Sequence, residues 1–179
     1  MTSLLARMAV AASVVGVVVV AAACASTPDD ATTAKLALGP LAPDDYDALV
    51  HPVLERRCGS IDCHGALPRG LRVYGETGLR LPNDAGLVPG GGATTLAEKR
   101  ATYDSIVALQ PERTNALLLK EPRTAADAYQ LSLLTKATAT ERHRGGASVV
   151  RGEPAEQCIV TWLVGHADAT LCATGAKSP

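Results

Sequence analysis

The segment VLERRCGSIDCHG, residues 53–65, places two cysteines and a histidine at the end of an apolar helical pattern. Covalent haem attachment usually has the signature C-x-x-C-H. Here four residues separate Cys58 from Cys63, and His64 follows directly, so the pattern is C-x4-C-H. These residue types fit three kinds of site: a haem site with a longer loop, a local disulfide, or half of a zinc site.

The first 23 residues predict export. One positive charge, Arg7, precedes an apolar run from Met8 to Ala23 that is long enough for the hydrophobic region of a signal peptide. The run ends in small residues followed by Cys24, which resembles the lipobox of bacterial lipoproteins, where this cysteine is acylated. We therefore expect a lipoprotein signal peptide over residues 1–23. The alternative is an uncleaved anchor helix, and both place the rest of the chain outside the cytoplasm.

Acyl chains on Cys24 would anchor the protein stably to a membrane. Ala25 follows the cysteine, which by resemblance to known sorting rules favours the outer membrane, facing the periplasm or the exterior. Residues 24–42 are rich in Thr, Ala, Pro and Asp, so we expect the lipidated cysteine to be followed by a flexible tether. Residues 43–179 are long enough for a single domain with its own core.

Charge and aromatic content limit the class of protein further. The chain has 17 Lys and Arg against 18 Asp and Glu, without a long basic run, which excludes nucleic acid as an expected partner. Phe is absent, and Trp162 with four Tyr supplies all the aromatic bulk. The core must therefore be built mainly from aliphatic side chains, and a bound group that is not an amino acid could add to it.

Apolar periodicity predicts a helix over residues 43–57. Pro52 lies inside that pattern, so a kink or a restart is expected there. Gly59 is suited to end the helix. The two cysteines and His64 then fall in the turn that follows.

Downstream, Gly and Pro interrupt residues 65–94, and the triple glycine lacks the Lys and Ser/Thr of a phosphate loop. Thr95 and Glu98 form a capping-box pattern that opens a helix to about Leu109. Pro154 starts a last helix that Gly165 closes.

Two short apolar segments, 117–119 and 131–134, predict one or two helical turns each. Polar loops are expected between them and over residues 135–146. The expected fold class is mainly α, with long Gly/Pro-rich loops.

Three separated segments resemble the cytochrome-c-like domains of secreted bacterial proteins, especially planctomycete-type cytochrome c. They are HPVLERRCGSIDCHG (51–65), LSLLTKATATERHRGG (131–146) and EQCIVTWLVGHA (156–167). The segments occur in the family's order and bracket most of the chain after the tether. The resemblance implies a cytochrome-c-like domain over residues 43–179, with haem c as cofactor and electron transfer as function.

The resemblance also implies site residues. Cys58 and Cys63 would hold haem covalently, and His64 would be the proximal iron ligand. Two thiols must reach the two vinyl groups of one porphyrin, and an insert between them can loop outward. Gly59 and Ser60 would make that longer loop flexible.

The distal ligand cannot be Met, because Met1 and Met8 both lie in the leader. His143, His166 and His51 are the candidates, or the position has no protein ligand. We favour His143 because it lies in a Gly-rich loop and matches the family's His-containing element. A solvated loop residue is an equal alternative for His143.

Cys158 and Cys172 have their simplest interpretation as a disulfide that pins the C-terminal tail to the last helix. Closing a loop of roughly fifteen residues stabilises a fold by about 3 kcal/mol. Trp162 is expected in the core.

The leading hypothesis is a lipid-anchored c-type cytochrome that passes electrons to a redox protein and is not an enzyme. The alternative is a haem-less lipoprotein of cytochrome-like fold with two disulfides, Cys58–Cys63 and Cys158–Cys172, and a structural or partner-binding role. A zinc site on Cys58, Cys63, His64 and a further ligand such as His143 is the third hypothesis. No nucleophile motif or carboxylate pair indicates a hydrolase.

Overall fold

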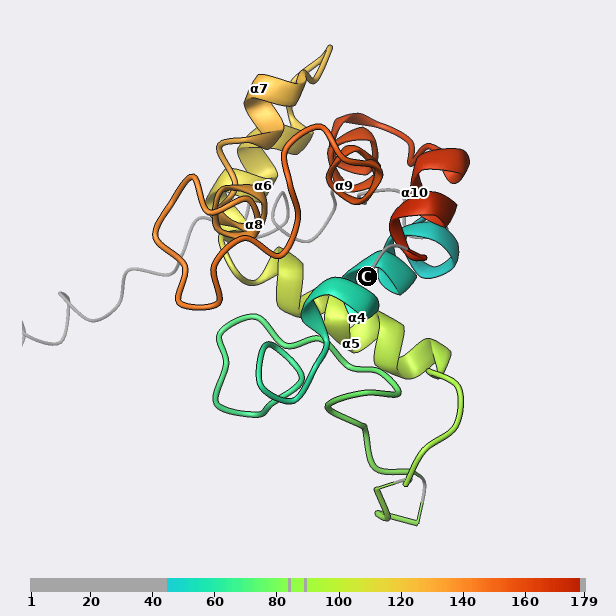
Figure 1. Ribbon diagram of the computed structural model, residues 1–179. Coiled ribbons are helices and arrows are strands. Elements are labelled where there is room, and N and C mark those ends of the chain that lie inside the picture. The colour runs from blue at the N-terminus through green and yellow to red at the C-terminus, as the bar shows by residue number, and fades with distance from the viewer. Residues whose placement is uncertain (1–44, 84, 89, 178–179) are drawn as a thin grey trace, which may run out of the picture. The chain divides into compact units, whose positions relative to one another are not determined.

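Helices dominate the described part of the chain, residues 45–83, 85–88 and 90–177 of a computed structural model (Figure 1). These residues fall in one of two units into which the chain divides, Gly39–Pro179. The other unit, Met1–Leu38, lies outside the described residues, and so do the predicted signal peptide, Cys24 and the tether. None of the described helices has the length and apolar character needed to cross a membrane.

The elements follow in chain order as η1 (Tyr46–Val50, a π-helical turn), α4 (His51–Cys58), α5 (Leu96–Val107), α6 (Pro111–Leu118), α7 (Ala125–Ala128), α8 (Ser132–Ala137), α9 (Pro154–Val164) and α10 (Ala169–Gly175). Extended structure in the described residues is a single bridge between Tyr74 and Leu79. The mainly α fold class is therefore confirmed.

At Pro52, where the sequence predicts a kink or a restart, the type of helix changes instead. The π-helical η1 runs without a break into α4, which has Pro52 in its first turn, so the change from π- to α-helix occurs next to the proline. At the other end of α4, the N–H of Gly59 donates to the carbonyl oxygen of Glu55 at 3.0 Å. Gly59 thus ends the helix as predicted, and the cysteine–histidine turn begins there.

The capping box at the start of α5 also fastens the preceding loop. The Glu98 carboxylate accepts from the Thr95 N–H at 2.8 Å and pairs with the Arg80 guanidinium at 2.7 Å, and Glu98 is buried. Burial alone would raise the pKa of Glu98, but the hydrogen bonds from Arg80, Thr95 and Leu81 lower it to about 2. The ionised pair therefore ties the Gly-rich loop to α5.

The core forms around α9, which packs against η1, α7, α8 and α10. Trp162 is fully buried, as expected, and its ring centroid lies 5.2 Å from that of Tyr46. Figure 1 shows the long green loop between α4 and α5 on the side of these two helices away from α9. The helices thus supply the packed body, and the loops carry the cysteine–histidine turn.

The disulfide between Cys158 and Cys172 is confirmed, and it joins α9 to α10. Helix α10 itself was missed, although Asp168 caps it by accepting from the N–H groups of Thr170 and Leu171. Short helices with little apolar periodicity depend on such caps and on packing more than on propensity.

Two predicted loops were wrong in part. The segment between the apolar stretches contains α7, which opens with a capping box between Thr124 and Asp127. Helix α8 continues to Ala137, inside the stretch expected to be loop, because Leu134 and Ala137 extend its buried face. Burial of these side chains extends the helix past the polar residues between them.

The disulfide gives a stability prediction. Replacing both Cys158 and Cys172 by Ala removes a cross-link between residues 14 apart in sequence, so the free energy of unfolding should fall by about 3 kcal/mol. Denaturant unfolding followed by circular dichroism measures this loss. Cys63→Ala, at an exposed free thiol, is the matched control and should change stability little. Equal stability of the double variant and the control would contradict the structural role of the cross-link.

Candidate functional site

The turn after α4 is closed by backbone hydrogen bonds. The N–H of His64 donates to the carbonyl oxygen of Cys58, and the N–H groups of Cys63 and Gly65 both donate to that of Ser60, each at 2.9 Å. The four residues between the cysteines therefore form a hydrogen-bonded turn. This differs from the flexible loop that Gly59 and Ser60 led us to expect.

Three glycines make this turn possible. A Cβ atom on Gly65 would lie 2.1 Å from the carbonyl oxygen of Gly59, and one on Gly78 would lie at the same distance from that oxygen. Real Cβ atoms do not approach backbone oxygens so closely, so both positions require glycine. The close backbone packing joins the turn to the following loop and fixes the direction in which His64 leaves the chain.

The two cysteines of the turn have different environments. Cys58 is buried and Cys63 is exposed, and both are free thiols. Burial raises the pKa of Cys58 to about 11, so it stays protonated at neutral pH, with its sulfur 3.7 Å from the Ser148 hydroxyl oxygen. The second disulfide of the haem-less alternative, Cys58–Cys63, is not formed in this structure.

His64 is held with one ring nitrogen available. Its Nδ1 lies 3.0 Å from the carbonyl oxygen of Leu71, and since a carbonyl only accepts, Nδ1 carries the hydrogen. This leaves Nε2 as the nitrogen that can bind a metal, an arrangement common among metal-binding histidines. Burial lowers the pKa of His64, and the charges of His143 and Arg69 lower it too, so the ring is neutral at pH 7.

His143 faces the same space from the loop that follows α8. Its Nδ1 lies 2.8 Å from the carbonyl oxygen of Gly146, which leaves its Nε2 available as well. The centroids of the His64 and His143 rings are 5.8 Å apart, and the ring planes differ by 6°. Metal–imidazole bonds are about 2 Å long, so two imidazoles on opposite sides of one ion have centroids about 6 Å apart. The observed separation is close to this value, but the two rings are stacked, so sharing one ion through both Nε2 atoms would require the rings to turn edge-on to each other.

Two adjoining cavities meet at this histidine pair. The first, of about 230 Å³, is mostly apolar, and its wall includes Cys58, Leu54, Leu71, Leu109, Leu133 and Ala137. The second is an open cleft of about 490 Å³ whose wall includes Cys63, Asp62, Arg69, Arg142 and Arg144. His64, Lys136 and His143 line both. The open cleft alone falls in the size range of cofactor sites, about 300–1,000 Å³, and the apolar cavity is smaller.

The other two histidines lie elsewhere. His51 is fully buried in α4, with Nε2 3.0 Å from the carbonyl oxygen of Tyr74, and His166 is exposed, with Nδ1 3.3 Å from the Asp45 carboxylate. Neither lines the two cavities. Of the three histidines considered as partners of His64, the structure brings His143 alone to it.

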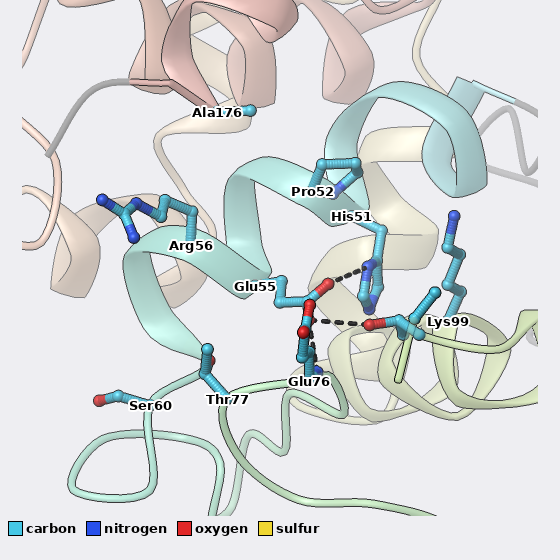
Figure 2. Close-up of a pocket in the computed structure, with 11 residues that line it drawn as sticks. His51, Pro52, Glu55, Arg56, Ser60, Glu76, Thr77, Lys99 and Ala176 are labelled. Carbon is cyan, nitrogen blue, oxygen red and sulfur yellow. Dashed lines mark hydrogen bonds and ion pairs between the residues drawn. The ribbon is translucent and has the colours of Figure 1, made fainter. Parts of the chain in front are cut away.

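A larger cavity, of about 590 Å³, opens beside α4 (Figure 2). Figure 2 shows the Glu55 carboxylate at its centre, directed toward the His51 ring and Glu76. This carboxylate accepts from the Glu76 N–H at 2.6 Å and the Thr94 hydroxyl at 2.8 Å, and lies 3.6 Å from His51 Nδ1. Its hydrogen bonds join α4 to two separate points of the long loop before α5, so the arrangement has a structural explanation. None of the residues predicted to hold haem lines this cavity.

The zinc hypothesis gains no support. Among the described residues, no group of three or more His, Cys, Asp or Glu side chains is placed to hold a metal ion. Within the described residues, the pair of His64 and His143 has no third such side chain placed beside it. The four nitrogens of a porphyrin would supply further ligands.

Several lining residues were not predicted. Leu71, Leu109 and Leu133 come from three separate parts of the chain, and no local pattern marks them as neighbours. Arg69 and Lys136 are likewise remote in sequence from each other. Arg142 and Arg144, which flank His143 in the sequence, were the available signal for a positively charged wall.

No family model, curated protein or solved structure matches this chain. The resemblance to cytochrome-c-like domains thus rests on the three sequence segments. The function has to be inferred from the residues and the geometry of the site.

Gly65→Ala tests the packing of the turn. The added Cβ meets backbone at 2.1 Å, so we expect a loss of about 1–3 kcal/mol in the free energy of unfolding. Chemical denaturation measures the loss. Gly70→Ala is the matched control, because nothing lies within 4 Å of its Cβ position, and it should shift stability by less than about 0.5 kcal/mol. Equal effects of the two substitutions would show that the turn is not tightly packed.

Proposed function

We propose that the chain is a lipid-anchored, c-type cytochrome-like protein that holds haem covalently and transfers electrons in the cell envelope. One observation carries this proposal: His64 and His143 face a common space at the junction of two cavities, and the walls of these cavities contain Cys58 and Cys63. The sequence resemblance and the predicted export signal support the same function.

Each group of the site has a role in this proposal. Cys58 and Cys63 would form thioether bonds by adding S–H across the two vinyl groups: sulfur bonds to one vinyl carbon, hydrogen moves to the other, and no electrons are lost or gained. His64 and His143 would bind the iron through their Nε2 atoms. Bound haem would supply one-electron iron chemistry, at a lower potential than with His/Met ligation.

The chain's own side chains would tune and protect this site. The Leu71 and Gly146 carbonyl oxygens orient the two imidazoles through Nδ1–H hydrogen bonds. The leucines of the apolar cavity would keep water from the bound group. Electrons would pass to a redox protein partner at the open cleft. We propose no substrate and no catalytic step.

Covalent attachment is the direct test. The full-length chain is expressed with haem-attachment machinery, denatured, and examined by haem staining and mass spectrometry. The expected result is a Soret band in the native protein and a haem adduct that survives denaturation. Cys58→Ser and Cys63→Ser should each leave one thioether, and the double variant should leave none.

Ile61→Ser, at an exposed residue of the same turn, is the matched control and should keep the full adduct. A chain without Soret band or adduct, in which Cys58 and Cys63 are bonded to each other, would contradict the proposal. That outcome would favour the haem-less lipoprotein with a structural or partner-binding role.

A further inference from the structure

Three arginines beside the histidine pair lack an acidic partner. Elsewhere in the described chain some cations pair with carboxylates, as in Arg57–Glu153, Arg80–Glu98, Arg100–Asp47 and Lys120–Asp127. Others contact a backbone oxygen or an aromatic ring, as Arg113 does with Gln130 and Arg151 with Tyr129. Among the described residues, Arg69, Arg142 and Arg144 form no ion pair, and Arg69 donates only to the backbone oxygen of Asp62, at 3.1 Å. The chain as a whole has a net charge of −1, so this local excess of positive charge is not a general property of its surface.

These arginines line one cleft, that of about 490 Å³. Lys136 lines it as well but pairs with Glu141 at 2.8 Å, and Asp62 is the acidic side chain in the wall. With three guanidinium groups and one acidic side chain in its wall, the cleft has a positive local charge that favours an anion. The guanidinium group forms paired hydrogen bonds to carboxylates, which makes a carboxylate a fitting anion.

The neighbouring cavity narrows the choice of anion. The cleft shares His64, Lys136 and His143 with the apolar cavity, so a ligand that fills both has an apolar body and an acidic edge. Simple inorganic anions would leave the apolar cavity empty, and a neutral hydrophobic ligand would leave the arginines without a partner. A tetrapyrrole with two carboxylate side chains meets both requirements.

We propose that Arg69, Arg142 and Arg144 bind the carboxylates of the tetrapyrrole whose apolar body occupies the adjoining cavity. This inference rests on the proposed function and adds the residues that recognise the acidic edge. The recognition requires no covalent bond, so it can be measured separately from attachment.

Mesohaem allows carboxylate recognition to be measured without covalent attachment. It has ethyl groups in place of the vinyl groups of haem, and ethyl groups cannot react with thiols. The purified full-length chain is titrated with mesohaem and with mesohaem dimethyl ester, in the same detergent, and the Soret band is followed. Two charge-assisted hydrogen bonds lost on esterification should weaken binding about 10- to 100-fold. The Arg142→Gln/Arg144→Gln variant should weaken mesohaem binding by a similar factor and leave ester binding unchanged.

Arg56→Gln is the matched control, because Arg56 is an exposed arginine that lines the separate cavity of about 590 Å³ beside α4. This variant should bind mesohaem as the unchanged chain does. Succinate, a dicarboxylate without an apolar body, should not compete at millimolar concentration. Competition by succinate would show a general anion site and overturn the proposal.

Failure of this inference and failure of the proposed function give different results. The carboxylate-binding role would be overturned if the unchanged chain did not bind mesohaem. It would also be overturned if the unchanged chain and the double variant both bound mesohaem and its ester equally well. Covalent attachment of ordinary haem could still be observed in either case. Arginine-dependent mesohaem binding without any covalent adduct of ordinary haem would support the carboxylate site and contradict the c-type function.

Discussion

The carbonyl oxygen of Gly59 lies so close to Gly65 and Gly78 that neither position has room for a side chain. This backbone contact closes the turn between the two cysteines and joins it to the following loop, in which Leu71 accepts the Nδ1–H bond of His64. The direction of the His64 ring therefore depends on the glycine contact. The facing position of His143 and the shared wall of the two cavities depend in turn on that ring.

The two cavities have complementary chemistry. One is apolar and contains the buried Cys58, while the other is open and contains Cys63 with several cations. A ligand bound here would contact an apolar wall on one side and charged side chains on the other. This environment suits an amphipathic planar group better than a bare ion. The scarcity of aromatic residues is consistent with this arrangement, since aliphatic side chains form the apolar wall and a bound ring would add the missing bulk.

Local signals in the sequence predict helices α4, α5 and α9, but the shorter helices and the site only in part. Gly59, the Thr95–Glu98 capping box and Pro154 mark helix ends, and Pro52 marks the change from π- to α-helix, because each acts on its own backbone neighbourhood. Helix α10 was missed because its stability comes from one cap and from packing on α9. The apolar cavity could not be predicted, because Leu71, Leu109 and Leu133 meet only through tertiary packing. The pairing of His64 with His143 followed from resemblance, and its geometry came from the structure.

The spin state of the iron tests the central claim most directly, that His64 and His143 lie on opposite sides of one metal centre. Electron paramagnetic resonance of the ferric, haem-loaded protein should give a low-spin signal, as expected for two axial imidazoles, and His143→Ala should convert it to high spin. His166→Ala, at an exposed histidine outside both cavities, should leave the signal unchanged. A low-spin signal that survives His143→Ala, or a high-spin signal in the unchanged protein, would contradict the account.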